Sequence, residues 1–320
     1  MSEVKVNKLS PRSGTTVTIG DSGDTINVVG TLQNNGSGVG ITSKEGGTNF
    51  TNSLLVGTSS TGTLDAATGN TGVGVGVFGA LTSGDDNVAV GLNALDVNTT
   101  GSNNVAVGSS SMLSATTGGA NTAVGTCSLK SNTTGVHNVA VGKDALEANT
   151  TGCESTALGK DAMTATTTGI RNVAVGKGAL KTNTTGNGNV ALGREALGVA
   201  TTASCNTAVG FDSLQANTTG CFNTAVGNQT SFTNTEGCMN TVMGNSALYT
   251  NTTGDCNTAL GSAALLSATT ADGNTAVGRN SLRTNTTGAN NVAVGTDALC
   301  LNTTGCRNTA VGFQAGGDNT

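Results

Sequence analysis

A glycine recurs every 17 residues over most of this chain, in 14 copies with no insertion between them. A fixed period of this length predicts a solenoid, in which each repeat is one coil stacked on the next. Enzymes carry their chemistry on loops of irregular length, so uniform spacing favours a rod over an enzyme. The glycines in register are Gly91, Gly108, Gly125, Gly142, Gly159, Gly176, Gly193, Gly210, Gly227, Gly244, Gly261, Gly278, Gly295 and Gly312.

Composition supports a thin core. The 320 residues include 49 Gly, no Trp and only 2% aromatic residues, so large core side chains are scarce. The net charge of −5 gives no basic surface for nucleic acid. The first ten residues lack the apolar core of a signal peptide, and no stretch approaches the roughly 18 apolar residues of a membrane span. We therefore expect synthesis in a host cytoplasm, no nucleic-acid partner and no membrane insertion.

One repeat, residues 138–154, defines positions 1 to 17 of the coil. Positions 1 to 5 predict a short strand, in which positions 2 and 4 share one face and positions 1, 3 and 5 share the other. Position 4 is aliphatic, as at Val141, or Met243, and we expect it to point into the coil. Position 3 is Ala in 13 of the 14 copies, with Val242 as the exception, which suggests close approach by another backbone.

A second apolar anchor follows the glycine at position 9, where Leu146 stands in the type repeat. The residues around it fit either a second strand or a single helical turn. Asn149-Thr-Thr-Gly152 then predicts a turn, because Asn and Gly tolerate positive φ. Stacked coils place equivalent residues about 4.8 Å apart, so Asn and Thr side chains should form ladders.

The chain divides into three predicted parts: an attachment segment (1–35), degenerate transitional coils (36–84) and the regular solenoid (85–320). In the first part, alternation from Val17 to Val28 predicts a β-hairpin or two short strands. Gly40, Gly57 and Gly74 share the phase of the later glycines, so coiling is expected to begin near Gly40.

Tandem Asn-x-Ala-Val-Gly over residues 87–312 resembles the head repeats of trimeric autotransporter adhesins, which are β-rolls, and repeat tracts of marine phage tail fibres. Residues 6–24, Val-Asn-Lys-Leu-Ser-Pro-Arg-Ser-Gly-Thr-Thr-Val-Thr-Ile-Gly-Asp-Ser-Gly-Asp, are similar to the starts of phage fibre proteins, especially those of cyanophages. The coil is longer than in the adhesins, and a signal peptide, a coiled-coil stalk and a membrane-anchor barrel are not found. These differences favour the phage family.

The resemblance implies a homotrimeric tail fibre located on the virion. Its partners would be a phage tail or adaptor protein, bound through the N-terminal segment, and a glycan or protein receptor on the host surface. A bacterial surface adhesin head and an ice-binding solenoid with stacked Thr ladders are the alternatives. No cofactor, metal or catalytic role is expected.

Two motifs match functional signatures, but we interpret both as structural parts of the coil. Gly74-Val-Gly-Val-Phe-Gly79 matches the dinucleotide fingerprint but lacks a helix signal after it, so a coil corner is expected. Eight Asn-Thr-Thr triplets match glycosylation acceptors, yet they repeat as part of the turn and predict a ladder. They begin at Asn98, Asn132, Asn149, Asn183, Asn217, Asn251, Asn285 and Asn302.

The eight cysteines form no C-x-x-C, and His137 is the only histidine, so a zinc site is not expected. Cys221 and Cys238 lie one coil apart, close enough for a disulfide, although reduced thiols that fill space are the favoured state. The remaining cysteines are Cys127, Cys153, Cys205, Cys256, Cys300 and Cys306.

Variation concentrates at positions 6, 7, 10, 16 and 17, which are expected to face solvent and, with the distal end at 307–320, to bind a receptor. Carboxylates such as Asp144 and Asp161 are interpreted as solvated rather than catalytic. The aromatic group Phe211, Phe222, Phe232 and Tyr249 fits a sugar platform or local core filling. The candidate receptor-facing residues are Lys143, Asp144, Glu147, Glu154, Phe222, Tyr249 and Arg307.

Overall fold

The computed structural model describes residues 33–34, 37–38, 43–45, 50–57 and 62–317, and the chain divides into units 1–41 and 42–320. In the first unit, β1 (Gln33–Asn34) and β2 (Ser37–Gly38) form an antiparallel pair. The strands predicted between Val17 and Val28, and Gly40, lie outside the described residues. Among the described residues, no helix is long and apolar enough to cross a membrane.

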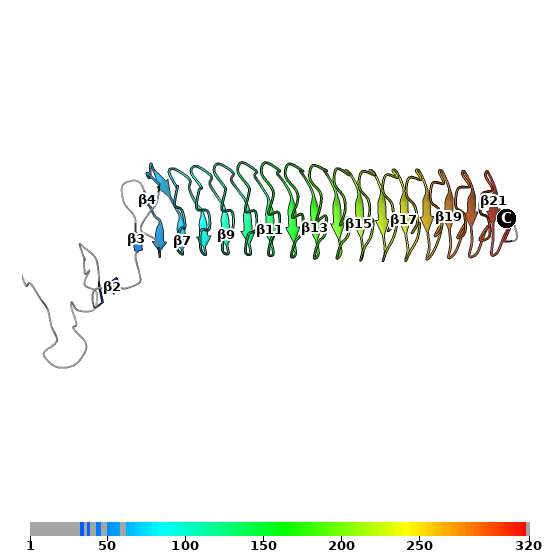
Figure 1. Cartoon of the computed structure of the whole chain (residues 1–320), viewed down its shortest axis with the longest axis horizontal. Helices are drawn as coiled ribbons and strands as arrows, with labels where there is room; N and C mark the ends of the chain where they lie inside the picture. The colour runs from blue at the N-terminus through cyan, green and yellow to red at the C-terminus, as the bar shows by residue number, and fades with distance from the viewer. Residues whose placement is uncertain (1–32, 35–36, 39–42, 46–49, 58–61, 318–320) are drawn as a thin grey trace, which may run out of the picture. The chain divides into compact units, whose positions relative to one another are not determined.

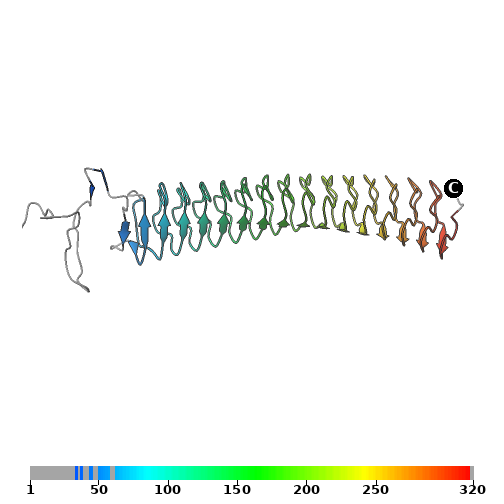
Figure 2. The same cartoon turned by 90° about the horizontal axis from the view of Figure 1, so that it is seen from below.

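The second unit is a parallel β-solenoid (Figure 1; Figure 2). It begins with β3 (Ser43–Glu45), antiparallel to β5 (Leu54–Val56), and with β4 (Phe50–Thr51) parallel to β6 (Ala67–Thr68). From β5 onward each strand pairs in parallel with the strand 17 residues later, as Leu54 does with Thr71. At about 4.8 Å per coil, the roughly 15 turns from β5 to β21 span about 72 Å. The predicted all-β solenoid of 17-residue coils is confirmed.

The coil strands are three residues each and lie on one side of the solenoid. After β5 they are β7 (Thr71–Val73), β8 (Val88–Val90), β9 (Val105–Val107), β10 (Thr122–Val124), β11 (Val139–Val141), β12 (Thr156–Leu158), β13 (Val173–Val175), β14 (Val190–Leu192), β15 (Thr207–Val209), β16 (Thr224–Val226), β17 (Thr241–Met243), β18 (Thr258–Leu260), β19 (Thr275–Val277), β20 (Val292–Val294) and β21 (Thr309–Val311).

The prediction that position 4 points into the coil is wrong. In β11, Ala140 at position 3 is fully buried, whereas Val141 at position 4 is 37% exposed. The same pattern holds in β8 and in β10 to β14. Alternation correctly grouped the residues into two faces, but the small residues form the inner one.

The inner face is small because the coil is thin. Leu146 at position 9 fills the interior opposite the strand, and Ala at positions 3 and 8 leaves room for it. In the first coils the inner volume is also shared between large and small residues, but the residues differ. There Leu55 at position 3 and Phe78 at position 9 are buried, and a Cβ on Gly72 would lie 2.6 Å from the Leu55 side chain. Large inner residues are thus matched by glycine.

The segment after the glycine is a run of turns, neither a second strand nor a helix. Its backbone groups bond between coils, as Leu146 N–H does to Ala162 O at 3.0 Å. Asp144 and Leu146, at positions 7 and 9, have φ of 58° and 51°. Position 5 is glycine because Gly142 has φ +134° and a Cβ there would lie 2.5 Å from Gly159 O. The close backbone approach that the small residues suggested therefore falls at position 5.

Buried asparagines at position 1 bind each coil to the one before it. Asn138 donates its backbone N–H to Asn121 Oδ1 at 2.9 Å and its Nδ2 to the same oxygen at 3.2 Å. Asn138 Nδ2 also donates to Gly152 O at 2.8 Å, which closes its own coil. Ser155 interrupts the row but still accepts Asn172 N–H at 3.2 Å. The predicted asparagine ladder is present here as well as in the turn.

A second ladder runs through position 12, where Asn149 Nδ2 donates to Asn132 Oδ1 at 2.8 Å. It breaks wherever the next coil lacks Asn at this position, and the last Asn before each break is left with a buried Oδ1 that has no partner. These residues are Asn98, Asn149, Asn183 and Asn251, which precede Ala115, Thr166, Ala200 and Ala268. Position 12 of the coil after Asn302 is Asn319, which lies outside the described residues. The residues that break the ladder therefore account for the orphaned amide oxygens of these four asparagines.

Restoring the ladder should stabilise the solenoid. Ala115→Asn places an amide between Asn98 and Asn132 and allows two new buried hydrogen bonds. We expect a gain of about 2 kcal/mol, at about 1 kcal/mol for each bond, seen as a higher Tm in thermal unfolding followed by circular dichroism.

Ala200→Asn is the matched control, because its coil carries Ala203 where most coils have Gly. A Cβ on Gly152, the equivalent residue, would lie 2.4 Å from Asn149 Oδ1. Ala200→Asn should therefore lower the Tm, and adding Ala203→Gly should reverse the loss. Equal Tm changes for Ala115→Asn and Ala200→Asn would contradict the ladder argument.

Candidate interaction surfaces

The outward residues of the strands form the first candidate surface. We call positions 2 and 4 of β8 to β21 the strand face. Position 4 is an aliphatic residue in all but one coil, and its exposed fraction is 36% at Val124 and 55% at Met243. Position 2 is Val or Thr and is half-buried in most coils. Because parallel sheets are normally covered on both faces, this continuous aliphatic row is unusual for a sheet open to water.

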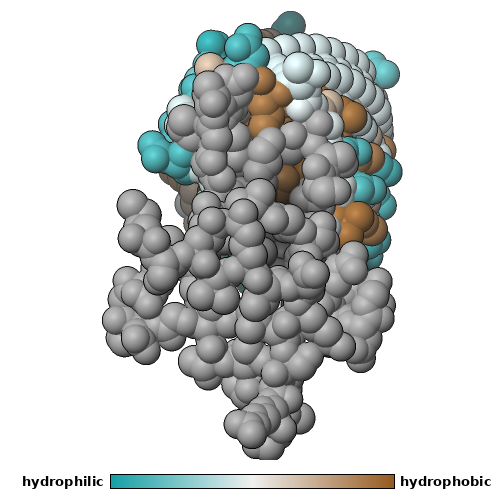
Figure 3. All heavy atoms as spheres, turned by 90° about the vertical axis from the view of Figure 1, so that its left-hand side faces the viewer, coloured by the Kyte–Doolittle hydropathy of each residue, from teal (hydrophilic) through white to brown (hydrophobic). Residues whose placement is uncertain are grey.

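Exposed rows of constant chemistry follow the solenoid because every coil repeats the same positions. Figure 3 shows brown, pale and teal residues arranged in such rows. The turn row contains Thr at position 13, whose hydroxyl is used internally: Thr150 Oγ1 donates to Thr167 O at 3.1 Å. Position 14, as at Thr151, is exposed. Only one of the two threonines in each turn therefore presents a free face to water.

The Asn-Thr-Thr asparagines are buried, as the ladder interpretation predicted. Asn98, Asn183 and Asn251 are fully buried, and their Nδ2 atoms donate to the glycine carbonyl that ends each turn. A glycan cannot be attached to an amide in this position without opening the coil. In the dinucleotide-like motif, β7 ends at Val73 and turn residues follow, so the coil-corner interpretation is confirmed.

Three of the candidate receptor-facing residues, Lys143, Asp144 and Glu147, lie together on the turn side of one coil. Lys143 Nζ is 2.9 Å from Asp144 Oδ2, and Lys130 Nζ is 3.6 Å from Glu147 Oε1. The hydrogen bond and the charge of Asp144 raise the pKa of Lys143. The Asp144 and Glu147 carboxylates lie within 4.8 Å of Cys127 Sγ, but both are already paired with lysines.

Three further candidates, Glu154, Phe222 and Arg307, share position 17. We call the outward residues at positions 16 and 17 the junction ridge. All three are exposed, and Phe222 is 63% exposed. Arg171 Nε donates to Glu154 Oε2 at 2.8 Å. This hydrogen bond and the positive charge of Arg171 lower the pKa of Glu154, and the same bond and the negative charge of Glu154 raise the pKa of Arg171.

The aromatic residues do not form one open platform. Tyr249, the remaining candidate, stacks on Phe232 with ring centroids 5.2 Å apart and planes within 9°. These two rings therefore cover one another's inner faces. Phe211 lies on another row beneath the Arg194 guanidinium, 5.3 Å from the ring centroid, and Phe222 stands apart on the junction ridge.

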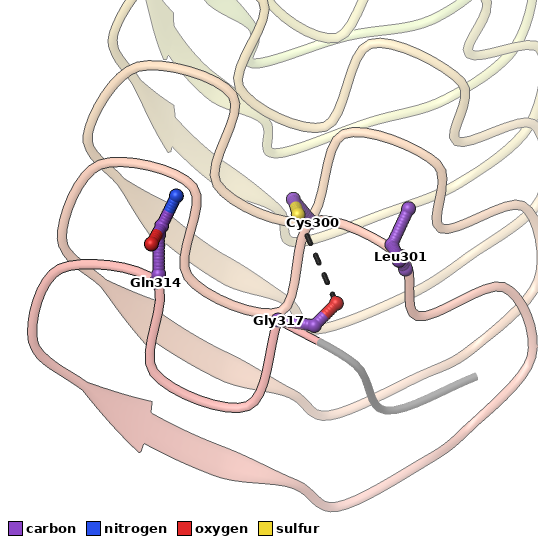
Figure 4. A pocket seen from close by; sticks show the side chains of 4 residues that line it. All are labelled: Cys300, Leu301, Gln314 and Gly317. Atoms are coloured by element: carbon purple, nitrogen blue, oxygen red, sulfur yellow. Dashed lines mark hydrogen bonds between the residues drawn. The ribbon is translucent and has the colours of Figure 1, made fainter.

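A pocket of ≈ 290 Å³ lies at the last described coil (Figure 4). Cys300, Leu301, Gln314 and Gly317 line it, and Cys300 Sγ donates to Gly317 O at 3.9 Å. Side chains are more exposed here than in the middle coils, with Val311 at 69% and Phe313 at 72%. None of these four described lining residues has a charged side chain.

Comparison with known protein families and with curated proteins finds no match for this chain. The surfaces must therefore be interpreted from their own chemistry. Sequence reasoning found the junction ridge and the turn-side cluster through their variability. It missed the strand face because it placed those aliphatic residues inside.

The Glu154–Arg171 pair gives a direct electrostatic test. The pKa of Glu154 lies below its usual range, so the contribution of the pair to stability is present above the unfolded-state pKa and is lost as the pH falls through the lowered value. Because the pair is fully exposed, that contribution is small. Arg171→Gln should raise the pKa of Glu154, measured by NMR titration of its side-chain carboxyl. Lys181→Gln is the control and should leave it unchanged.

Proposed function

We propose that this protein is a structural and binding component of a phage virion: a homotrimeric tail fibre that projects from the particle and engages the host cell surface. The observation that carries the proposal is the strand face. A regular aliphatic row that runs along the whole solenoid fits a long self-association surface far better than it fits an active site.

The energetics favour association through this face. All coils but one contribute an aliphatic residue at position 4, and in many coils it is at least a third exposed. It lies beside a Val or Thr that is half-buried in most coils. Burial of apolar area contributes about 25 cal/mol per Å², so a modest area repeated in every coil becomes a large total. The number of three chains comes from the resemblance to adhesin heads and phage fibres, not from this argument.

The close approach by another backbone that the alanines at position 3 suggest is not an approach by a second chain. Ala191 and the equivalent residues of β8 to β20 are buried within their own chain, so they cannot contact a neighbour. A charge at that position, as in Ala191→Glu, would sit in the core and unfold the coil rather than separate the chains.

The assignment to a phage rests on the similarity of residues 6–24 to the starts of phage fibre proteins. In this proposal the N-terminal segment docks to a tail or adaptor protein, and the junction ridge and the distal end contact a host glycan or protein receptor. In this proposal the protein acts by extending from the particle and binding a receptor rather than by catalysis.

Two other functions use the same fold. A bacterial adhesin head would present a similar strand face, and detection of the protein on bacterial cells rather than in virions would favour it. An ice-binding solenoid needs a flat array of free hydroxyls. The position 13 hydroxyls bond to backbone here, as at Thr150, which disfavours that function. Thermal hysteresis of the purified protein would support it.

Association should depend on position 4. We expect Val175→Glu combined with Leu192→Glu to convert the wild-type oligomer to monomer, because two carboxylates per chain would be buried in the interface. Sedimentation velocity measures the mass, and circular dichroism checks that the coils remain folded. Thr185→Glu, an exposed change at position 14, is the matched control and should stay oligomeric. A monomeric wild type would overturn the proposal for self-association.

Attachment should depend on the N-terminal segment. Deletion of residues 1–35 removes none of the solenoid strands, so a folded rod should remain. We expect it to bind host cells but to be absent from purified particles, as measured by mass spectrometry of virions. Full incorporation of the truncated protein would show that the proposed orientation is wrong.

A further inference from the structure

Two cysteines stand at the same position of consecutive coils and touch. Cys221 Sγ and Cys238 Sγ are 3.4 Å apart, and both thiols are free and half-buried on the junction ridge. At about 4.8 Å per coil, the separation of their backbones falls within the 4.4–6.8 Å range of Cα distances in disulfides. Bond formation at about 2.05 Å requires the sulfur atoms to approach by about 1.4 Å more.

We propose that Cys221 and Cys238 form a dithiol modification site, which a small-molecule disulfide oxidises to a bond between two coils. This inference is independent of the proposed fibre function. It concerns this pair alone among the eight cysteines, because no other two contact each other among the residues that the structure describes.

The surroundings of the pair give the two thiols different roles. The backbone N–H of Cys221 donates to Cys238 Sγ at 3.1 Å, and such a donor stabilises a thiolate there. Burial, followed by the hydrogen bond with Cys238, raises the pKa of the Cys221 thiol. Cys238 is therefore the attacking sulfur and Cys221 the resolving one, although Asp255, whose Oδ1 accepts the Cys238 N–H at 2.6 Å, adds a nearby negative charge.

The reaction is ordinary thiol–disulfide exchange. The Cys238 thiolate attacks one sulfur of the small disulfide RSSR, forms a mixed disulfide and releases one RS⁻. Cys221 then loses its proton, attacks Cys238 Sγ and releases the second RS⁻. The two protons from the cysteines convert the released thiolates to two RSH. RSSR gains two electrons, and the cysteine pair loses two.

The bond would close a loop of one coil. Residues 221 to 238 contain β16 and the turn run that follows it, so the cross-link would oppose separation of these two coils. At other coils the junction is held by noncovalent contacts, such as the hydrogen bond from Ile170 N to Asn187 Oδ1 at 2.8 Å and the Glu154–Arg171 ion pair.

The chain contains a matched control. Cys153 occupies the same position 16, accepts Val136 N–H at 3.4 Å and donates to Thr151 O at 3.2 Å, but the neighbouring coils have Val136 and Ile170 there. It has the same local setting without a partner thiol. Serine is a safe replacement, because Ser204 at this position accepts Asn187 N–H at 3.0 Å.

The experiment exposes the folded full-length protein to buffers of reduced and oxidised glutathione, followed by differential alkylation and peptide mass spectrometry. We expect a Cys221–Cys238 disulfide within one chain at a ratio of oxidised to reduced glutathione that leaves less than about a tenth of Cys153 glutathionylated. The reason is that ring closure is favoured by the high effective concentration of the second thiol. Cys221→Ser should instead accumulate a glutathione adduct on Cys238. Ile170→Cys should give Cys153 a partner thiol in the next coil and create a second intrachain disulfide.

Several results would overturn the proposal. They are stable glutathione adducts on both cysteines of the wild type, cross-links between chains at these residues, and modification of the pair at the same ratio as Cys153. Circular dichroism of each variant before oxidation ensures that the thiols react in the folded solenoid.

Discussion

The buried asparagine at position 1 is the interaction on which the rest of the solenoid depends. In most regular coils its amide bonds to the preceding asparagine and to the glycine carbonyl that closes its own coil, as Asn206 does with Asn189 and Gly220 O. These groups are fully buried, so a mismatch would leave them without partners in a medium where that is costly. Insertion of a single residue would displace the whole set, which explains why the period never changes over 14 repeats.

Once position 1 is inside, strand alternation determines the other positions. Ala at position 3 must also be inside, and positions 2 and 4 must be outside. The outward direction of the strand face is therefore a consequence of the asparagine ladder, whereas its apolar character is not required by the core. This makes the choice of Val and Leu at position 4 informative about contacts with other chains.

Much of the fold could be predicted from the sequence. The 17-residue period, the buried Leu146, the Asn149 turn and its ladder followed from spacing and from residue chemistry. The direction of Val141 could not, because alternation defines two faces without saying which is inner, and the usual preference for apolar cores favoured the larger residue. Gly72, between Leu55 and Phe78, carried the missing signal that inner volume is limited. The turn run around Leu146 was also undetermined, since positive φ at a leucine has no sequence signature.

The candidate surfaces could also be predicted only in part. Variability placed Glu154, Phe222 and Arg307 correctly on an exposed row, because positions free of packing demands vary. It could not show that Tyr249 stacks on Phe232 or that Lys143 pairs with Asp144, since those contacts depend on side-chain geometry. The function itself stays a proposal, supported by the strand face and by the resemblance of residues 6–24.

Surface and core vary independently along the solenoid, and the coils from β15 to β19 show this most clearly. Position 2 is Thr in all five of these strands, whereas β8, β9, β11, β13 and β14 have Val there. In the same stretch the junction ridge becomes apolar, with Cys205, Phe222, Met239 and Cys256 at consecutive position 17 sites. The ladder passes through without interruption, from Asn206 to Asn274. Apolar residues thus become fewer at position 2 and more frequent at position 17 while the inner hydrogen bonds stay the same, so a solenoid of this kind can change what it contacts without changing how it folds.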